Sequence, residues 1–403
     1  MTLRTSLLAV AGMLALATPA LAQTQGVGKN EIVLGTIQDL SGPVVSLSKP
    51  ALEGMQLRIE EANEQGGVHG RKLVLKVEDS GYDPKRAVLA AQKLVDQDRI
   101  FAMVGHIGTP TNVATFPTLF KKNVISFMPL SAGRQMYEPL NRLTYSFIAP
   151  YYDQMRIAAP RMAKDKGAKK VCTIYQDDDF GLEVLKGTED GLKAAGMSLV
   201  ERTSYKRGAT DFSSQVAKMK AAGCDLVVMG TTPRETIGTM AEARKSGFNA
   251  TFLSSAAAYI NAVPKLGGAA VEGLYMAMTI SVPYTDSPEQ PMRFWANKYK
   301  TRFDKEPDTF SAIGYVIMDA FIRAAEKAGA NLSTDTFVRA MEKSTFPPDI
   351  FGGPEMTFSP TKHLGSEAAR LSQVKNGRWA VVSDYTKRSQ KPWIPHFPFR
   401  RAP

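Results

Sequence analysis

Residues 32–77 read IVLGTIQDLSGPVVSLSKPALEGMQLRIEEANEQGGVHGRKLVLKV, and this stretch decides the fold class. It contains two short β-rich runs, Ile32–Ile37 and Leu73–Val77. Between them, Pro50–Asn63 has apolar residues at helical spacing and is followed by the helix-ending pair Gly66-Gly67. A strand, a helix and a second strand in this order are typical of a parallel sheet with helices on its faces. The stretch therefore predicts an α/β protein.

The same alternation continues toward the C-terminus. In the first part of the chain it predicts a helix over Pro84–Gln97, strands over Phe101–Val104 and Val124–Met128, and a helix from Thr109 that Pro117 should kink or split. From residue 171 it predicts strands over Val171–Tyr175, Ser198–Arg202, Leu226–Met229, Thr251–Leu253 and Leu274–Met278, and helices over Gly181–Ala195, Phe212–Ala222 and Pro233–Ser246. Two such sets predict two doubly wound parallel-sheet lobes.

The C-terminal third of the sequence changes character. Three helices are expected in a row, over Met292–Phe303, Ala312–Ala328 and Thr334–Lys343. Two apolar runs then flank Asn376-Gly377, which is a hairpin signal. Residues 387–403 are basic and rich in proline, so we expect a tail without a regular helix.

Composition excludes several classes of protein. The 403 residues are 44% apolar and 22% charged, which is ordinary for a globular protein and unlike a disordered or polytopic membrane chain. The net charge of +11 is spread over expected helix faces, so we predict no nucleic-acid partner; steering of anionic ligands is the functional alternative. Four His and two Cys are too few for a metal centre. Without a nucleophile-elbow, zinc-protease or phosphate-loop motif, the sequence predicts a protein that is not an enzyme and has no cofactor.

The first 22 residues form a secretory signal. Arg4 precedes an apolar run, Leu7–Ala17, and Ala20-Leu21-Ala22 has the small-x-small pattern of a cleavage site after Ala22. The apolar run is short for a membrane-spanning anchor, which is the alternative. The junction lacks a Cys for lipid attachment, so we expect a monomeric periplasmic protein that is not a lipoprotein.

Cys172 and Cys224 begin strands that should be neighbours in the second lobe. An oxidising compartment permits a disulfide between them. Parallel neighbours rarely reach good disulfide geometry, and we therefore expect two buried free thiols, with the disulfide as the alternative.

Ligands of open parallel sheets bind beyond the carboxyl ends of the strands, at the starts of the following helices. Ser48, Thr109 and Thr232 each stand one or two residues before a proline, which is a helix-start pattern. Such a helix end attracts anions. A ligand carboxylate could therefore be held by Thr109, Ser131 and nearby amides, although each hydroxyl taken alone could simply cap its helix.

Six phrases of the sequence resemble the periplasmic solute-binding proteins of the leucine/isoleucine/valine family, which serve ABC importers of hydrophobic amino acids and amides. They are IVLGT (32–36), LSGP (40–43), NEQGGVHGRK (63–72), EDSGYDP (78–84), GHIGTPTN (105–112) and YQDDDFG (175–181). The resemblance implies a type I periplasmic binding fold, in which two lobes joined by a three-segment hinge close on a ligand. It places residues 30–147 and 282–345 in lobe 1, and residues 148–281 and 346–386 in lobe 2.

The resemblance also implies the site. In the family, loops at the positions of Ile107–Thr109 and Ser131–Gly133 hold the ligand carboxylate, and an aromatic at the Phe180 position packs on the ligand from the other lobe. The expected ligand-binding residues are Ser46, Leu47, Ile107, Gly108, Thr109, Ser131, Ala132, Gly133, Tyr152, Phe180, Thr231, Thr232 and Ala256.

One departure from the family bears on the ligand. Amino-acid binders place a Glu near the position of Ala256 to pair with the ligand ammonium, and residues 253–259 contain no acid. A buried ammonium without a countercharge is costly, so an amino acid is disfavoured unless Asp178 or Asp179 substitutes. We therefore expect a small carboxylate with an aromatic or branched aliphatic body, delivered to ABC permease subunits of the inner membrane. The alternatives are a hydrophobic amino acid as ligand, or a sensor of the same fold that presents its ligand to a receptor.

Overall fold

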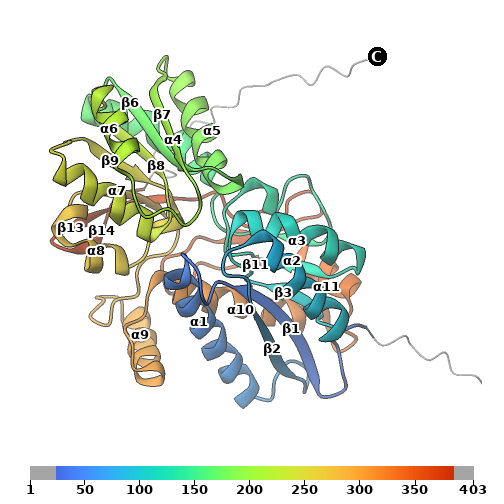
Figure 1. Cartoon of the computed structure of the whole chain (residues 1–403). Coiled ribbons are helices and arrows are strands. Elements are labelled where there is room, and N and C mark those ends of the chain that lie inside the picture. The colour runs from blue at the N-terminus through green and yellow to red at the C-terminus, as the bar shows by residue number, and fades with distance from the viewer. Residues whose placement is uncertain (1–23, 385–403) are drawn as a thin grey trace, which may run out of the picture.

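Two lobes, one above the other in Figure 1, make up the described part of the chain. The computed structural model describes residues 24–384. The predicted signal peptide, residues 1–22, and the predicted basic tail, residues 387–403, lie outside the described residues. The expected α/β class with two parallel-sheet lobes is confirmed.

The first lobe is built on five parallel strands in the order β2-β1-β3-β4-β5. Their bounds are β1 (Glu31–Gln38), β2 (Lys72–Asp79), β3 (Ala102–Val104), β4 (Ile125–Phe127) and β5 (Thr144–Tyr145). Strands β3 and β4 are buried throughout, as expected for a parallel sheet covered on both faces. Since β1, β3 and β4 are neighbours, the loops after them meet at one edge of the sheet.

Six helices cover this sheet, with α1, α10 and α11 packed together and α2 packed against α3. They are α1 (Val45–Glu64), α2 (Pro84–Gln92, continued by a π-helical turn over Lys93–Gln97), α3 (Thr109–Lys121), α9 (Gln290–Phe303), α10 (Thr309–Ala328) and α11 (Thr334–Met341). Glycines let α1 and α10 approach closely: a Cβ at Gly54 would lie 1.9 Å from the carbonyl oxygen of Ser311, and one at Gly314 would lie 2.0 Å from that of Ala51.

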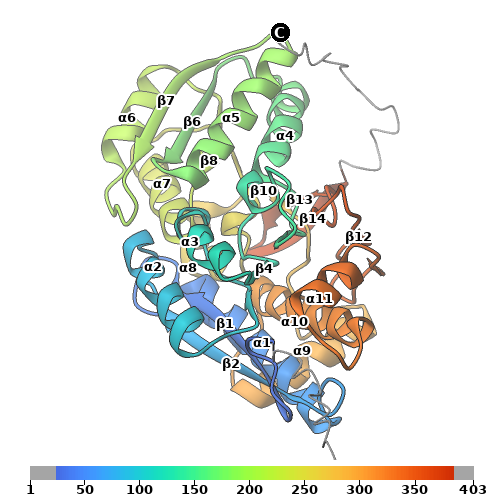
Figure 2. The same ribbon diagram turned by 90° about the vertical axis from the view of Figure 1, so that its right-hand side faces the viewer.

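The second lobe is built on a mixed sheet in the order β14-β13-β10-β9-β8-β6-β7. Its parallel strands are β6 (Val171–Gln176), β7 (Leu199–Tyr205), β8 (Leu226–Gly230), β9 (Thr251–Ser254) and β10 (Tyr275–Met278), and its antiparallel pair is β13 (Arg370–Lys375) with β14 (Arg378–Asp384). The helices are α4 (Tyr151–Lys166), α5 (Asp179–Ala194), α6 (Ser213–Ala221), α7 (Pro233–Lys245) and α8 (Ala262–Gly267). Figure 2 shows α4 and α5 side by side in this lobe.

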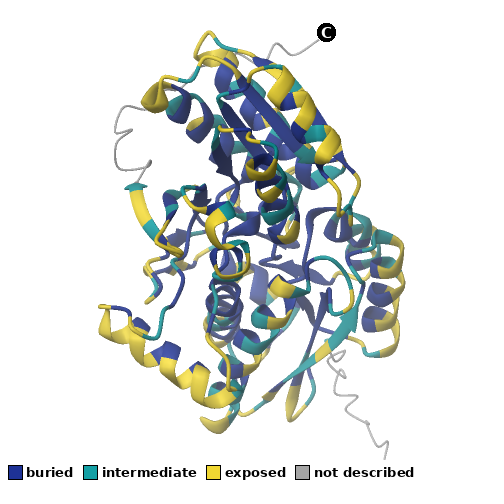
Figure 3. Cartoon of the chain, turned by 60° about the vertical axis from the view of Figure 1, so that its left-hand side comes forward, coloured by how far each residue is buried: buried dark blue, intermediate teal, exposed yellow. Residues whose placement is uncertain are grey.

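The chain passes between the lobes three times: after β5, after β10 and before β13. Buried residues fill the strands and the helix faces that cover them, and exposed residues lie on the outer helix faces (Figure 3). Within residues 24–384, every helix is too short or too polar to cross a bilayer.

Residues 346–364, which the sequence analysis assigned to lobe 2, contact the first lobe in the structure. A short hairpin of β11 (Thr345–Phe346) and β12 (Met356–Thr357) leads into a segment that packs on β5 of the first lobe. The Phe358 ring meets the edge of Tyr145 with centroids 5.9 Å apart, and the Ser146 amide donates to the carbonyl of His363 at 2.9 Å. These apolar side chains are buried on the first lobe, which fixes where the last crossing begins.

Several element boundaries differ from the prediction for identifiable reasons. Helix α1 begins at Val45, so Pro50 lies inside it and Ser48 is not its cap. The hydroxyl of Ser48 instead accepts the amide of Asp39 at 3.0 Å. Helix α3 runs unbroken through Pro117. Strand β5 and helix α4 were not predicted, because β5 has only two residues and α4 contains a proline.

Cys172 and Cys224 form a disulfide, so the expectation of two free thiols was wrong. Cys172 lies in β6, and Cys224 lies in the turn before β8, the strand next to β6. The geometric objection applied to residues paired directly across two strands. Because Cys224 stands just outside its strand, the Cα atoms approach to 5.9 Å, within the range that a disulfide spans.

Candidate functional site

A small cavity, of about 20 Å³, lies between the two lobes. Both lobes supply its walls, and most of the lining side chains are apolar. The lining residues are Val44, Leu47, Tyr82, Ile107, Gly108, Thr109, Leu130, Tyr151, Phe180, Thr232, Ala257 and Phe310. We call this space the cleft cavity. Its position at the carboxyl ends of the strands is where the fold predicts a ligand.

Thr109 lines the cleft cavity, and its hydroxyl is hydrogen-bonded to that of Ser131 outside the lining. Thr109 is the first residue of α3, and Ser131 lies in the loop after β4. Their side-chain oxygens are 2.7 Å apart, both residues are 1% exposed, and the Gly133 amide donates to the Ser131 hydroxyl at 3.2 Å. The positive end of the helix dipole adds to this environment. We call this feature the Thr109–Ser131 hydroxyl pair, and it suits a negatively charged ligand group.

Gly108, immediately before α3, is required by the space around it. Its φ of 90° lies in the region that glycine adopts without cost. A Cβ there would lie 2.4 Å from Cε2 of Tyr82. The absence of a side chain at Gly108 therefore allows the Tyr82 ring to form one wall of the cavity beside Thr109.

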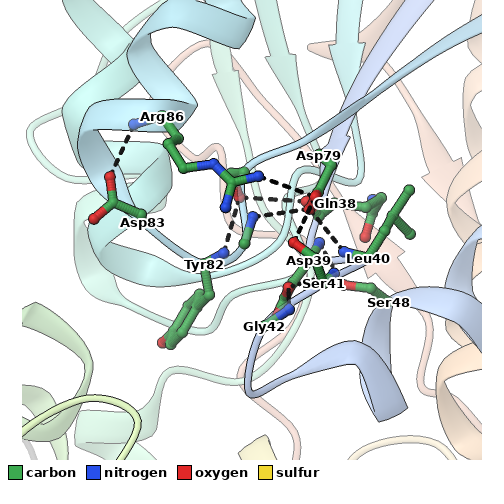
Figure 4. Close-up of polar contacts among 12 residues, drawn as sticks. Gln38, Asp39, Leu40, Ser41, Gly42, Ser48, Asp79, Tyr82, Asp83 and Arg86 are labelled. Carbon is green, nitrogen blue, oxygen red and sulfur yellow. Dashed lines mark hydrogen bonds and ion pairs between the residues drawn. The ribbon is translucent and has the colours of Figure 1, made fainter.

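Two carboxylates hold the loop after β1 in place (Figure 4). Asp39 accepts the amides of Gly42 at 2.5 Å and Val44 at 2.7 Å. Asp79 accepts the amide of Leu40 at 2.9 Å and the hydroxyl of Ser41 at 2.6 Å. Burial opposes ionisation of Asp79, but its hydrogen bonds, led by that from Ser41, hold its pKa below the ordinary value. The loop thus presents Val44 and Leu47 to the cavity from a fixed backbone.

Tyr82 links the lobes across the mouth of the cavity. Its ring points away from the Asp39 and Asp79 carboxylates in Figure 4. From the second lobe, the Gln176 side chain donates to the Tyr82 hydroxyl at 3.2 Å, and Arg207 donates to the Tyr82 carbonyl at 2.9 Å. Burial and the nearby Asp178 charge raise the pKa of Tyr82 well above its ordinary value, so the hydroxyl stays neutral.

Tyr151 and Phe180 form the aromatic wall contributed by the second lobe. Their ring centroids are 5.0 Å apart in an edge-to-face arrangement. Tyr151 is also tied to the first lobe, since its amide donates to the Ala132 carbonyl at 2.9 Å. Burial raises the pKa of Tyr151 to about 12, and a backbone hydrogen bond from Ala132 to its hydroxyl limits the rise.

A second cavity, also of about 20 Å³, adjoins the cleft cavity on the side of the crossing segments. We call it the hinge-side cavity. Its lining residues are Leu130, Ile148, Tyr151, Ala256, Tyr259, Met278, Thr279, Ile280, Thr309, Phe310 and Ile313. Leu130, Tyr151 and Phe310 line both cavities and so lie between them.

Neither cavity has an acidic residue in its lining. The nearest candidates are engaged elsewhere. Asp178 caps α5, accepts from Gln176 at 2.7 Å and lies 3.8 Å from Arg207. Glu235 is fully buried behind Thr232, accepts the Thr232 hydroxyl and pairs with Arg234 at 2.9 Å. No group of residues suited to hold a metal ion occurs in the part of the chain that is described.

His106 lies beneath the cavity, directly before Ile107. It is 1% exposed, and neither ring nitrogen has a hydrogen-bond partner within the described residues. Burial lowers the pKa of His106 to about 3, so the ring is neutral at ordinary pH. It therefore contributes no positive charge to an anion held above it.

The structure brings most of the predicted site residues together. Those that line the cleft cavity are Leu47, Ile107, Gly108, Thr109, Phe180 and Thr232, and Ala256 lines the hinge-side cavity. Ser131, Ala132 and Gly133 do not line either cavity, but they contact Thr109 and Tyr151, which do.

Three further predicted residues neither line a cavity nor make one of these contacts with a lining residue. Ser46 is exposed on the first turn of α1. Thr231 is buried, and its hydroxyl pairs with that of Thr236 at 2.6 Å. Tyr152 points away from the cleft: its hydroxyl donates to Asp190 at 2.8 Å, and the Arg134 guanidinium lies 3.9 Å from its ring centroid. The adjacent Tyr151 lines both cavities instead. Helix α4 was not predicted, so the sequence could not show which of the two tyrosines faces inward.

The sequence reading missed Tyr82, Tyr151, Ala257 and Phe310. Tyr82 follows β2, and the rule about carboxyl ends of strands would have found it had the loop after that strand been considered. Its φ of 59°, unusual for a residue with a side chain, is a structural sign of the same special position. Phe310 lies at the start of α10, far along the chain, and no local pattern marks it.

The fold and the cleft define a two-lobed binding protein, and comparison with known sequences agrees. The signature of the family described as periplasmic binding protein matches residues 31–378. The chain therefore belongs to the periplasmic binding protein family and is a solute-binding protein, not an enzyme. It is 26% identical over 329 residues to an "Amino acid binding protein" of Pseudomonas aeruginosa, covering 80% of this chain and 84% of that protein. It is 25% identical over 336 residues to "Leu/Ile/Val-binding protein homolog 7" of Brucella suis, covering 79% and 81%.

Solved structures share the fold. A "Fatty acid ABC transporter substrate-binding protein" from Thermomonospora curvata matches with a TM-score of 0.80 and 24% identity, over 90% of this chain and 94% of that one. A solute-binding protein of an ABC transporter from R. palustris, solved in complex with benzoate, matches with a TM-score of 0.78 and 15% identity, over 88% and 96%. The predicted family and the type I fold are thus confirmed.

Proposed function

We propose that the protein captures a small monocarboxylate with an apolar body in the cleft cavity. The observation that carries the proposal is the composition of that cavity: Thr109 at a helix start with its hydroxyl bonded to Ser131, mostly apolar walls, and no acid in the lining. A carboxylate fits beside Thr109 because hydroxyls and the helix dipole stabilise negative charge there. A zwitterion would bury its ammonium without a countercharge, which costs several kcal/mol.

The benzoate complex and the fatty-acid transporter protein support this choice by analogy of fold. Both names describe carboxylates with apolar bodies, and both structures cover nearly all of this chain.

A thermal-shift screen followed by titration calorimetry tests the proposal. Paired ligands that differ only in the amino group, such as 4-methylpentanoate and leucine, isolate the question. We expect the deaminated acid to raise the melting temperature and leucine to have a much smaller effect. The reverse order would contradict the proposal.

A hydrophobic amino acid is the second candidate, and a specific observation favours it. Glu235 is buried and accepts the hydroxyl of Thr232, a lining residue, so it is an acid one side chain away from the cavity. The relatives named as amino-acid and Leu/Ile/Val-binding proteins point the same way. Under this alternative, Glu235→Gln abolishes leucine binding, whereas under the first proposal it leaves binding of the deaminated acid nearly unchanged.

For the cellular role, we infer delivery of the ligand to ABC permease subunits of the inner membrane, by a monomer exported to the periplasm through residues 1–22. Family membership and the predicted signal sequence support this inference. Sequencing the N-terminus of secreted protein tests cleavage after Ala22. Uptake of the labelled ligand, lost on deletion of the gene, tests transport; unchanged uptake with a lost transcriptional response would favour a sensor.

A further inference from the structure

We propose that the hinge-side cavity is a second ligand subsite, which takes the far end of an elongated monocarboxylate and offers it a hydrogen bond from Thr309. This inference rests on the proposed carboxylate function and specifies the ligand class further. The ligand it predicts has its carboxylate at the Thr109–Ser131 hydroxyl pair, an apolar body between Tyr151 and Phe310, and one hydroxyl or carbonyl oxygen at the opposite end.

The position of the hinge-side cavity is the first observation. It shares Leu130, Tyr151 and Phe310 with the cleft cavity, so these residues lie between the two spaces. Side chains such as those of Tyr151 and Phe310 can change rotamer when a ligand binds. A ligand longer than the cleft cavity can therefore extend past Tyr151 and Phe310 into the hinge-side cavity.

The lining of the hinge-side cavity is the second observation. Ile148, Met278, Ile280 and Ile313 give it an apolar interior, and no charged residue lines it. Such a lining favours an apolar chain or ring over water or a charged group. Tyr259 closes the far wall with its own hydroxyl already bonded to Ser372 at 3.1 Å.

The Thr309 hydroxyl is the third observation, and it predicts a polar group on the far end of the ligand. Thr309 is 2% exposed and lines this cavity, and its side-chain oxygen has no hydrogen-bond partner among residues 24–384. The hydroxyl is not needed to start α10, because Asp308 caps that helix and accepts the Thr309 amide at 2.7 Å. A buried hydroxyl without a partner is costly, and a ligand oxygen beside it would remove that cost.

The position of Ala256 is consistent with a ligand that passes this way. Its amide donates to the Gln154 side chain at 2.9 Å, so the backbone polar group is satisfied and only the methyl faces the cavity. An acid at this position, as in amino-acid binders, would place a charge in the path of the apolar body.

Titration calorimetry with straight-chain monocarboxylates tests the subsite. We expect octanoate to bind at least tenfold more tightly than butanoate, since the longer chain buries more apolar surface. We expect 8-hydroxyoctanoate to bind roughly fivefold more tightly than octanoate, the size of one net hydrogen bond.

Three variants test whether the effects of chain length and of the terminal hydroxyl arise in the hinge-side cavity. Ile313→Phe fills the hinge-side cavity and should bring the octanoate-to-butanoate affinity ratio close to one. Ala257→Leu, in the cleft cavity, should weaken both acids together and keep their ratio. Thr309→Val preserves the shape and should abolish the preference for 8-hydroxyoctanoate over octanoate while octanoate binds as well or better.

The outcomes separate the two proposals. If butanoate and other short acids bind but the length ratio is near one in the unaltered protein, or Ile313→Phe leaves the ratio unchanged in a folded variant, the subsite is overturned and the carboxylate function stands. An equal affinity for octanoate and 8-hydroxyoctanoate overturns the role of Thr309. If no monocarboxylate of any length binds, both proposals are overturned.

Discussion

Arg134 of the first lobe and Glu183 of the second form a two-pronged ion pair across the cleft. The guanidinium donates from Nε to Oε2 and from a terminal nitrogen to Oε1, each at 2.8 Å, and the Arg134 amide also donates to this carboxylate at 3.3 Å. The Glu183 side chain is only 8% exposed, against 32% for Arg134. Because Arg134 directly follows Ser131–Gly133, the pair connects the predicted carboxylate loop to helix α5 of the other lobe.

Breaking this pair should weaken ligand binding by speeding dissociation. The two charges meet only when the lobes are together, so their attraction stabilises that arrangement alone. For Arg134→Met or Glu183→Gln we expect a loss of about 1–2 kcal/mol in binding, less than for a fully buried pair because Arg134 is partly exposed to solvent. Stopped-flow dissociation rates measure the effect.

The double variant is the control. If the pair acts as a unit, Arg134→Met combined with Glu183→Gln should cost little more than either change alone. A lower melting temperature with an unchanged dissociation rate would instead show that the pair serves folding only.

Removing one hydroxyl of the Thr109–Ser131 pair should weaken carboxylate binding. Thr109→Val keeps the shape of the side chain but leaves the ligand oxygen without that partner. We expect a loss of about 1–3 kcal/mol by calorimetry. Thr115→Val, on the same helix, also removes a buried hydroxyl, which donates to Asn112 at 2.9 Å away from the cavity. It should lower stability and leave affinity alone; equal effects of the two variants would argue that Thr109 is only structural.

Acid should destabilise the protein partly through His106. Its pKa is about 3 in the folded protein and about 6.5 in an unfolded chain. Below pH 6.5 the imidazole is therefore protonated in the unfolded chain but not in the folded protein. The free energy of unfolding falls by about 1.4 kcal/mol per pH unit until pH 3 is approached. His106→Gln removes this term. Its melting temperature relative to the unaltered protein should rise steadily between pH 7 and pH 4.

Asp308 should change stability with pH in the opposite direction to His106, so it serves as the control. Burial raises its pKa to about 6, so the folded protein takes up a proton that the unfolded chain, with an Asp pKa near 3.9, does not. Stability from this group is gained as the pH falls from 6 toward 4. The relative melting temperature of Asp308→Asn should therefore fall over the range in which that of His106→Gln rises. Parallel curves for the two variants would refute the assignment.

Removing the Cys172–Cys224 disulfide should lower stability without changing affinity. The bond closes a loop with a sequence separation of 52, and such a cross-link is worth about 2–4 kcal/mol. Cys172 lies near the start of β6 and Cys224 lies just before β8, at the opposite end of the sheet from the cavities. Denaturant melts of the Cys172→Ser, Cys224→Ser double variant test the first part, and calorimetry tests the second. A drop in affinity would mean that the bond also shapes the site.

Local sequence patterns predicted the strands well, because apolar runs such as Val171–Tyr175 are bounded by turn residues and are buried on both faces. They failed to predict elements whose existence or boundaries depend on tertiary contacts. Strand β5 has two residues and exists because the sheet beside it is already formed. The start of α1 at Val45 depends on Asp39 holding the preceding loop, which no residue near Pro50 reveals.

For the site, too, local patterns found some residues and missed those that depend on tertiary structure. Thr109 and Phe180 were found because they follow strands and match the family. Tyr151 was missed in favour of its neighbour Tyr152, since one residue decides which face of a helix a side chain occupies and α4 itself was not predicted. The hinge-side cavity could not be predicted from any segment, because Ile148, Met278 and Thr309 come from three distant parts of the chain.

The close contact of α1 with α10 has a consequence for biogenesis. Gly54 and Gly314 are separated by 260 positions, yet each fits directly against the backbone of the other helix. The first lobe, although it begins at the N-terminus, cannot complete its core until synthesis has passed residue 328. A chain that emerges from the ribosome thus keeps this lobe incomplete for most of its translation.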